Sequence, residues 1–575
     1  MKCNCAWICS ALLTLPTSSL VCAECSVWTV SETRHVLRSE QPTHTTTVQV
    51  AAARNEWVSF QIFLRSQAPI KSINLEAGDL RGPRGALIPG TSARLYREHQ
   101  VRLETGTYRN DNFKSDWYPD PLIPFTHPIT AKNLRTGRFV AVPFDLPAGE
   151  THGFWIDIYI PTNAVPGEYR GSYQITSTGG ATHLVPVSLT VWSFVLPQTP
   201  TLVTEFGFPN LRDYYRRISK TSQAPEPPDW NAVDAQCDQL LSEHHFNVPP
   251  PLDTVTPKGQ PDGSYLIASA QVRALREFVD TYHLNAIQTP HPSNVVKDPE
   301  AERERLRSWL RAFDRAGVEL DRTNVVFYTY LRDEPNTLED YRYVQKWGRA
   351  IREAKSVLKV LVVEQPWTAP GEGGADSAWG DLYGAVDIWC PLFSLHRQES
   401  AAERQALGET IWTYTALCQG PPTPWWHIDF PLLNYRVPTW MAWRDSMKGL
   451  LYWGGMSYWN QTEDPWTQAP FYTGNGQPQQ GAKGIVFQGE GSLVYPALAV
   501  GYDGIVPTIR LKALRDAIED YDYFALLQRC GKTSEAQEIV RSLTPTFSQW
   551  NKDPVAYEQA RARIAAMIVS QVSGK

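Results

Sequence analysis

From about residue 201 the chain repeats one pattern, in which a short apolar run is followed by an amphipathic helical stretch. Helical patterns such as Ala270–Tyr282, Ala301–Ala316 and Leu338–Ser356 separate the runs. Short buried runs that alternate with helices are typical of parallel sheets. Eight units in succession predict a (β/α)8 barrel of TIM type over residues 201–482. The runs are Leu202–Phe208, Phe246–Val248, Leu284–Thr289, Val325–Leu331, Val360–Val363, Val386–Pro391, Ile411–Leu417 and Leu450–Trp459.

A doubly wound sheet is the alternative arrangement of such units. The barrel is favoured because the runs number eight and no glycine-rich phosphate-binding fingerprint follows the first of them.

The segment before the barrel has a different pattern. Residues 24–197 alternate apolar and polar side chains, as in Val58–Leu64 and Phe154–Ile160, and contain turn residues such as Pro166-Gly167. Several short strands without a long helical pattern predict an antiparallel β-sandwich. The Pro-containing stretch Leu196–Pro200 is expected to be the linker that follows it.

Residues 483–575 predict a mostly helical region packed on the barrel. Its first helix has an apolar face, and further helical stretches lie near 533–544 and 554–570. The apolar positions of that first helix are Leu511, Leu514, Ile518, Tyr521 and Ala525.

The N-terminus has the features of an export signal. Lys2 precedes the apolar run Ala6–Leu15, and Val21-Cys22-Ala23 is a small-residue cleavage site. We therefore expect residues 1–23 to be a signal peptide and the protein to be periplasmic or extracellular. This run is too short to span a bilayer, and no later segment is long and apolar enough, so no integral membrane segment is predicted.

Composition narrows the choice of partner. The formal net charge is −6 without a basic block, which argues against nucleic acid as a partner. The 21 Trp and 25 Tyr residues suit either a large core or a cleft where rings stack on a glycan or glycoconjugate substrate. After signal cleavage the cysteines are widely spaced, so we expect no metal site. We also expect no cofactor. The sequence does not indicate an oligomeric state.

The fourth apolar run ends in two adjacent acids and a proline, Asp333-Glu334-Pro335. Barrel enzymes carry their chemistry at the carboxyl ends of strands, and Pro335 should end the strand ladder. Neighbouring strand residues face opposite ways, so both acids reach one cleft only if the chain bends there. Two carboxylates with different environments suit glycosidic bond cleavage, which needs a proton donor and a nearby anion. The alternative is a solvated acidic turn before the next helix.

Short segments along most of the chain resemble glycoside hydrolase family 123 and its wider relatives, often filed as a domain of unknown function. The segments that carry the resemblance are Ala53-Arg54-Asn55-Glu56-Trp57, Ser59-Phe60-Gln61, Trp117-Tyr118-Pro119-Asp120-Pro121-Leu122, Pro166-Gly167-Glu168-Tyr169-Arg170-Gly171, Asp333-Glu334-Pro335, Ile428-Asp429-Phe430-Pro431, Leu451-Tyr452-Trp453 and Leu514-Arg515-Asp516-Ala517-Ile518-Glu519-Asp520-Tyr521.

The resemblance implies a sandwich-plus-barrel enzyme that cleaves β-linked N-acetylgalactosaminides by substrate-assisted catalysis, with the 2-acetamido oxygen as nucleophile. It implies that Glu334 is the general acid and base and that Asp333 orients the acetamido group. Adjacency of the two acids agrees with this scheme, because a carboxylate nucleophile would lie across the cleft, about 5 Å from the acid.

The sequence leaves two alternatives open. The first is a glycosidase of other specificity whose nucleophile is a late-strand carboxylate, with Asp429, Glu463 and Asp464 as candidates. The second is a non-catalytic carbohydrate-binding protein of the same architecture.

Other side chains near the predicted strand ends are candidates for substrate binding. Tyr330 and Tyr328 have the strand parity of Glu334, so Tyr330 should lie beneath it, although inner barrel packing is as good an explanation. The predicted binding residues are Tyr330, Asn247, Trp367, Tyr414, Asp429, Tyr458 and Trp459.

Overall fold

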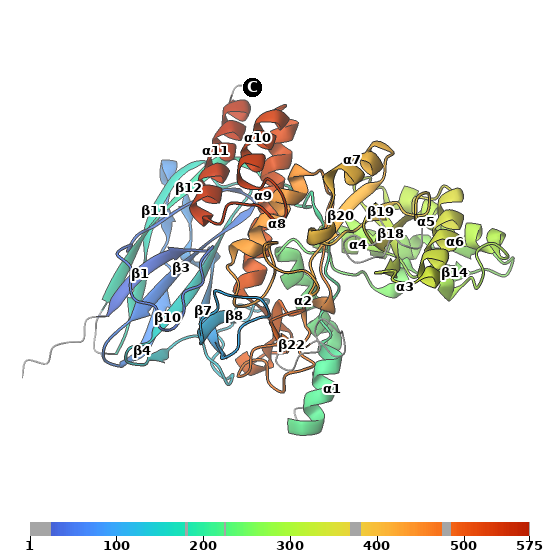
Figure 1. Cartoon of the computed structure of the whole chain (residues 1–575). Helices are drawn as coiled ribbons and strands as arrows, with labels where there is room; N and C mark the ends of the chain where they lie inside the picture. The colour runs from blue at the N-terminus through green and yellow to red at the C-terminus, as the bar shows by residue number, and fades with distance from the viewer. Residues whose placement is uncertain (1–24, 179–181, 223–225, 368–380, 474–484, 574–575) are drawn as a thin grey trace, which may run out of the picture.

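The computed structural model describes residues 25–178, 182–222, 226–367, 381–473 and 485–573. The predicted signal peptide, residues 1–23, lies outside these described residues. Figure 1 shows a two-sheet domain in blue and cyan, a helix-and-strand domain in green to orange, and a red group of C-terminal helices packed against both. No helix in the described ranges has the length and apolarity needed to cross a membrane.

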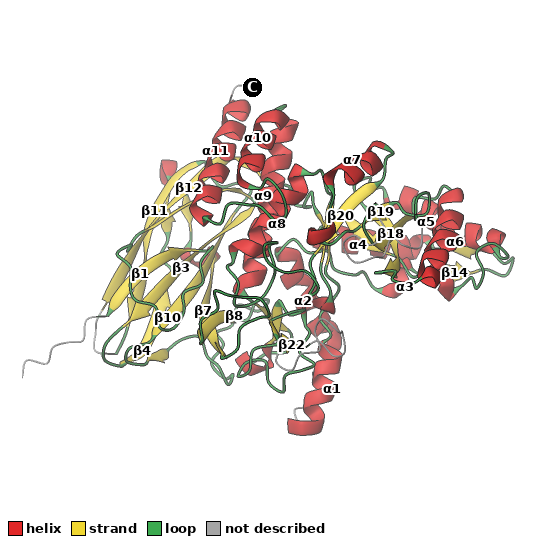
Figure 2. Cartoon of the chain, in the orientation of Figure 1, coloured by secondary structure: helices red, strands yellow, loops and turns green. Residues whose placement is uncertain are grey.

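The N-terminal domain is a sandwich of two sheets (Figure 2). The first sheet is antiparallel throughout and has the order β1 (Ser26–Ser31), β3 (Glu56–Arg65), β10 (Thr151–Ile160), β7 (Ala93–Leu103) and β8 (Asp116–Pro124). The second has the order β2 (Val48–Arg54), β12 (Thr182–Val195), β11 (Gly167–Thr176), β4 (Ile70–Glu76) and β9 (Phe144–Leu146), with β5 (Leu80–Arg81) and β6 (Leu87–Ile88) beside it.

One pairing departs from the predicted antiparallel arrangement, because β2 and β12 are parallel. The connection that follows β2 is at Asn55, which has a positive φ of 61°. There the chain leaves β2 in the second sheet and enters β3 in the first, so β2 cannot form a hairpin with its successor.

The second domain is built on a nearly closed sheet of seven parallel strands, not the eight that were predicted. Seven of the eight predicted runs overlap a strand of this sheet. In sheet order these are β13 (Val203–Glu205), β21 (Gly449–Leu451), β20 (Thr410–Tyr414), β19 (Ile388–Trp389), β18 (Lys359–Val363), β17 (Val326–Asp333) and β16 (Ala286–Gln288).

The predicted second run, Phe246–Val248, lies between β13 and β16 without forming a ladder. Side chains make the connections instead: the Asn247 amide donates to Thr204 O at 3.1 Å and to Asn285 Oδ1 at 2.8 Å. Asn285 in turn donates to Leu202 O at 2.9 Å. Both amide protons of Asn247 are used here, and Asn285 precedes β16. The predicted binding residue Asn247 therefore lies at the amino ends of the strands, away from Asp333 and Glu334.

Helices surround the barrel sheet and then cover its amino end. The barrel helices are α1 (Leu211–Ser222), α2 (Trp230–Glu243), α3 (Leu252–Val255), α4 (Ser269–Tyr282), α5 (Arg303–Leu320), α6 (Leu338–Glu353), α7 (Gln398–Ala406) and α8 (Leu433–Arg444). The C-terminal helices are α9 (Ile509–Arg529), α10 (Thr533–Leu543) and α11 (Pro554–Ser573). Two-residue and three-residue strands β14 (Lys258–Gly259), β15 (Tyr265–Leu266), β22 (Phe471–Tyr472), β23 (Phe487–Gln488), β24 (Val494–Pro496) and β25 (Ile505–Pro507) pair in the connections.

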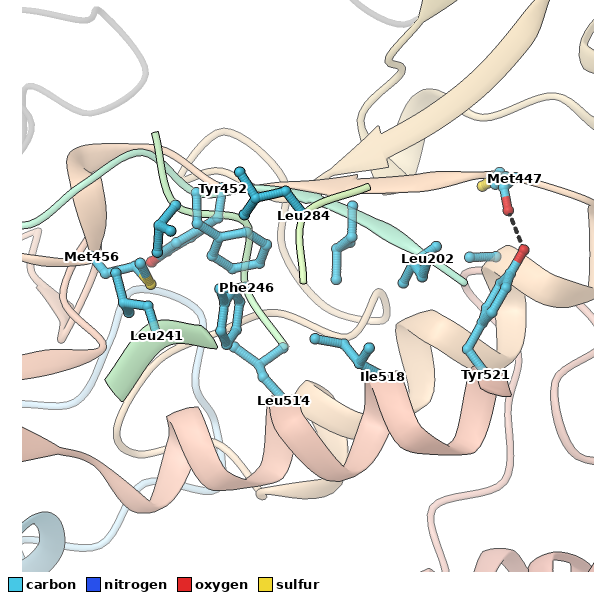
Figure 3. Close-up of a cluster of buried hydrophobic side chains, with 14 of the residues drawn as sticks. Leu202, Leu241, Phe246, Leu284, Met447, Tyr452, Met456, Leu514, Ile518 and Tyr521 are labelled. Carbon is cyan, nitrogen blue, oxygen red and sulfur yellow. Dashed lines mark hydrogen bonds between the residues drawn. The ribbon is translucent and has the colours of Figure 1, made fainter. Parts of the chain in front are cut away.

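Helix α9 closes the barrel core from below (Figure 3). Leu514, Ile518 and Tyr521 point toward Leu202 and Phe246, and Tyr521 donates a hydrogen bond to Met447 O at 2.8 Å. These are positions of the apolar face that the sequence predicts. The opposite side of α9 is also buried, which a single apolar face does not predict.

The polar side of α9 is buried because it pairs with the neighbouring parts of the chain. Arg515 donates to Asp157 of β10 at 3.1 Å, and Arg510 binds Asp120 of β8 at 2.6 and 2.9 Å. Asp520 accepts a bond from Arg436 of α8 at 2.7 Å. Charges are buried only at high cost unless they are paired, so these contacts hold the sandwich, α9 and the barrel in one arrangement.

The Asp120–Arg510 pair provides a test of this junction. Both side chains are fully buried, so Asp120→Asn leaves an uncompensated guanidinium and should destabilise the fold by about 3 kcal/mol or more. Asp280→Asn is the matched control, because Arg322 binds Asp280 with the same two-bond geometry on the surface. The control should leave the midpoint of denaturant unfolding unchanged. Equal effects of the two variants would contradict the account.

Glu98 of β7 predicts a pH dependence of stability. Burial raises its pKa to about 8, and neither carboxyl oxygen has a hydrogen-bond partner among the described residues. The unfolded chain loses this proton near pH 4.3, so the stability it contributes falls as the pH rises toward 8. The melting temperature of Glu98→Gln minus that of wild type should therefore become more positive as the pH rises from 5 to 8. A constant difference over that range would contradict the prediction.

Candidate active site

Strand β17 changes its side-chain alternation just before the two acids. Tyr330 lies opposite Leu361 of β18, but Arg332 lies opposite Val362, so Leu331 is one extra residue on this strand. Such a β-bulge reverses which face each later residue occupies.

The bulge turns Asp333 toward the interior of the barrel. Asp333 lies opposite Val363, an inward-facing residue of β18, and accepts a hydrogen bond from the Tyr330 hydroxyl at 2.9 Å. Arg332 faces outward and pairs with Asp340 of α6. Without the bulge, Asp333 would face α6 and Arg332 would occupy the barrel mouth. The sequence pattern assigned Tyr330 to the same side of the strand as Glu334. That assignment was wrong, because the bulge places Tyr330 on the same side as Asp333.

Glu334 reaches the same mouth because of its backbone conformation. Its φ is 36°, a left-handed conformation that costs energy for a residue with a side chain. Its carboxylate accepts a hydrogen bond from the Tyr414 hydroxyl of β20 at 2.5 Å. β17 ends at Asp333, as the proline at 335 predicts. Both acids are solvent-exposed at the carboxyl end of the barrel, and each is held by its own tyrosine.

Aromatic rings fill the barrel beneath the acids. Tyr328 and Trp412 are buried inside the sheet and pack edge to face, with ring centroids 5.2 Å apart. The Tyr328 hydroxyl donates to Glu205, a half-buried acid at the end of β13. Sequence reasoning missed Glu205, although an acid within the apolar run 202–208 was the available signal. Burial raises the pKa of Glu205 to about 7.

Half-buried aromatic rings lie beyond the end of β21. Tyr458, a predicted binding residue, lies 5.1 Å from Trp453 and 5.5 Å from Tyr472, measured between ring centroids. Trp453 donates from its indole nitrogen to Glu490 at 2.5 Å, and burial raises the pKa of Glu490 to about 8. Trp453 and Tyr472 were not predicted as site residues, although Trp453 lies within the predicted run Leu450–Trp459.

Two of the predicted binding residues, Trp459 and Trp367, are buried beneath other side chains. Trp459 is 1% exposed and donates to Val494 O at 3.0 Å, so it belongs to the core. Trp367 is 5% exposed, and the Arg397 guanidinium lies 3.8 Å above its ring. Neither ring offers an open face, because neighbouring side chains already cover both of them.

The late-strand acids are engaged mainly with the sandwich domain. Asp429 is buried and accepts bonds from Thr107 N at 2.7 Å, Thr107 Oγ1 at 2.6 Å and Asn110 Nδ2 at 3.0 Å. Burial raises the pKa of Asp429, and these bonds oppose the rise. Asp464 pairs with Arg138 at 2.8 Å. Glu463 is exposed on the following loop. Asp429 thus ties the two domains together.

A separate cavity of about 810 Å³ lies between β1, β2 and α11 of the molecule. Hydroxyl side chains and the ion-paired Arg436 and Arg561 line it, and neither Asp333 nor Glu334 does. Among the described residues, no group of three or more His, Cys, Asp or Glu side chains could hold a metal ion. The cysteines in the same ranges are free thiols, of which Cys237 and Cys390 are buried.

Comparison with protein families gives two matches. The model described as the glycoside hydrolase 123 N-terminal domain matches residues 28–177. The model described as the glycoside hydrolase 123 catalytic domain matches residues 295–527, which include Asp333 and Glu334. Among curated protein sequences, none matches this chain significantly.

Among solved structures, the fold resembles a family 123 glycoside hydrolase from Clostridium perfringens, whose structural analysis concerned glycolipid glycan hydrolysis. The TM-score is 0.61 at 14% identity, over 96% of this chain and 97% of that one. A family 39 glycoside hydrolase from Bacteroides cellulosilyticus is more distant, with a TM-score of 0.31 at 9% identity over 82% of this chain and 81% of that one.

Proposed function

Because the chain belongs to glycoside hydrolase family 123, and is therefore a glycosidase, we propose that it hydrolyses β-linked N-acetylgalactosaminides by substrate-assisted, retaining catalysis. The observation that carries this proposal is the acid pair at the end of β17, in which Asp333 and Glu334 share one barrel mouth while different tyrosines hold them.

In the proposed reaction Glu334 donates a proton to the glycosidic oxygen. The acetamido carbonyl oxygen of the same sugar bonds to C1 as the bond from C1 to the leaving oxygen breaks. Asp333 accepts a hydrogen bond from the acetamido N–H and stabilises the positive charge that develops on the cyclised group. Glu334 then takes a proton from a water molecule as the water oxygen attacks C1. The bond between C1 and the acetamido oxygen breaks, and the sugar is released with its original anomeric configuration.

The surroundings of Asp429 and Asp464 support this mechanism over one in which either acid is the nucleophile. A carboxylate nucleophile must approach C1 freely from the face opposite the general acid. Asp429 is buried with three donors on it, and Asp464 is bound to Arg138. Two adjacent acids on one strand do not straddle a sugar ring, but they suit a proton donor beside an orienting anion.

We also propose that the enzyme acts outside the cytoplasm, on the basis of the signal-like residues 1–23. The expected result of expressing the full chain in its host is an exported protein whose mature N-terminus, read by mass spectrometry, is Glu24. Retention of Met1 in the active protein would contradict export by this signal.

Replacing the acids tests the assignment. Glu334→Gln and Asp333→Asn should each lower kcat on 4-nitrophenyl N-acetyl-β-galactosaminide by about 10²- to 10⁴-fold, because each removes a group that acts in the transition state. Glu353→Gln is the control, since it makes the same chemical change at an exposed position of α6. Unchanged melting temperatures would separate lost chemistry from lost folding, and full activity in either acid variant would refute its role.

A thiazoline that mimics the cyclised intermediate tests the acetamido mechanism. It should inhibit wild type competitively, and Asp333→Asn should bind it at least about tenfold more weakly, because a charge-assisted hydrogen bond is lost. An active enzyme that the thiazoline does not inhibit, together with covalent labelling of Asp429, Glu463 or Asp464 by a 2-fluoro sugar, would support the rival mechanism instead.

A further inference from the structure

Glu205 is a carboxyl group at the barrel mouth to which the proposed reaction assigns no task. It is the last residue of β13, and Val203, two positions earlier, belongs to the cluster inside the barrel. Alternation along a strand therefore directs Glu205 inward as well. The side chain is half-buried, so it faces the mouth and does not lie wholly within the packed interior.

The aromatic floor of the barrel positions this carboxyl group. Tyr328 of β17 reaches across the interior and donates its hydroxyl to Glu205. The ring of Tyr328 is fixed in turn by the edge-to-face contact with Trp412. A side chain held in this way is preorganised, which is what a binding residue requires and what an exposed surface acid lacks.

Glu205 and Asp333 approach the same region from different sides. Burial raises the pKa of the Cys390 thiol, and the nearby carboxylates Asp333 and Glu205 raise it further. The Tyr330 hydroxyl, which binds Asp333, has a raised pKa to which Glu205 also contributes. In sheet order, β18 and β19 separate β17 from β20, and β21 separates β20 from β13. Asp333, the tyrosine that holds Glu334, and Glu205 thus lie around the mouth on three separate strands.

We propose, on the basis of the proposed function, that Glu205 is a specificity-determining residue that binds the hydroxyl groups at the C4 and C6 edge of the sugar. Asp333 and Glu334 engage the acetamido group at C2 and the leaving oxygen at C1. The edge of a pyranose ring opposite C1 and C2 carries the C4 hydroxyl and the C6 hydroxymethyl group. With one edge held at β17 and β20, the other edge is directed toward β13.

The chemistry of Glu205 suits hydroxyl groups. A carboxyl oxygen accepts a hydrogen bond from a sugar hydroxyl, and the Tyr328 hydroxyl occupies only part of the capacity of the group. A site built to bond a substrate hydroxyl rejects an analogue that lacks it, because its own buried polar group is then left unpaired. Since galacto- and gluco-configured sugars differ at C4, Glu205 would discriminate between them.

The test combines enzyme variants with deoxy substrates. Wild type, Glu205→Ala, Glu205→Gln and the control Glu353→Gln are assayed on 4-nitrophenyl N-acetyl-β-galactosaminide and on its 4-deoxy and 6-deoxy analogues. Glu205→Ala should lower kcat/KM on the parent substrate about 10- to 100-fold, mainly through KM, and Glu205→Gln should recover part of the loss by retaining an acceptor. The wild-type penalty for at least one deoxy analogue should shrink to about twofold or less in Glu205→Ala.

Each outcome decides the proposal. Deoxy penalties in a folded Glu205→Ala that equal those of wild type would overturn it, as would an unchanged KM for the parent substrate. If Glu205→Ala does not fold, the same comparison with Glu205→Gln decides, because that variant preserves size and a hydrogen-bonding oxygen. Absence of wild-type turnover on every galactosaminide would overturn the proposed function and this inference together, whereas normal turnover without any role of Glu205 overturns this inference alone.

Discussion

The bulge at Leu331 is the constraint on which the candidate site depends. One inserted residue exchanges the sides of Arg332 and Asp333, so a carboxylate replaces a guanidinium at the barrel mouth. The left-handed backbone of Glu334 then brings the next carboxylate to Tyr414. Strain of this kind persists only where surrounding contacts hold it, and here the neighbouring strands and tyrosine hydroxyls do so. The position of both adjacent acids at one barrel mouth is a consequence of this local distortion.

Buried ion pairs and hydrogen bonds hold the barrel that carries the bulge against the sandwich and α9. Helix α9 packs its apolar side under the barrel and binds the sandwich through Asp157 and Asp120. Asp429 lies in the connection between β20 and α8, near the other end of the barrel. It accepts hydrogen bonds from Thr107 of the sandwich. The sandwich therefore contacts α9 at one end of the barrel and the Asp429 loop at the other, so Asp429, a candidate nucleophile in the sequence, has structural partners.

Periodicity predicted most of the fold, because burial of regular apolar patterns is what forms strands and helices. It failed at Phe246–Val248, where Asn247 and Asn285 side chains replace backbone pairing, a substitution that no hydrophobic pattern encodes. It also failed for Trp459, since a ring at a strand end looks the same in sequence whether it is covered or open. The acid pair was predictable from its position after the fourth run. Glu205 was marked only as an acid within an apolar run, and its contact with Tyr328 could not be predicted because the two residues are distant in sequence.

In the proposed mechanism the acetamido oxygen of the substrate is the nucleophile, and Asp333 and Glu334 assist it. A series of substrates with zero to three fluorine atoms on the acetamido methyl group measures this directly, because fluorine withdraws electron density from the carbonyl oxygen. If the acetamido oxygen is the nucleophile, kcat/KM of the wild-type enzyme should fall steeply with each added fluorine. A kcat/KM that does not change along the series would contradict it.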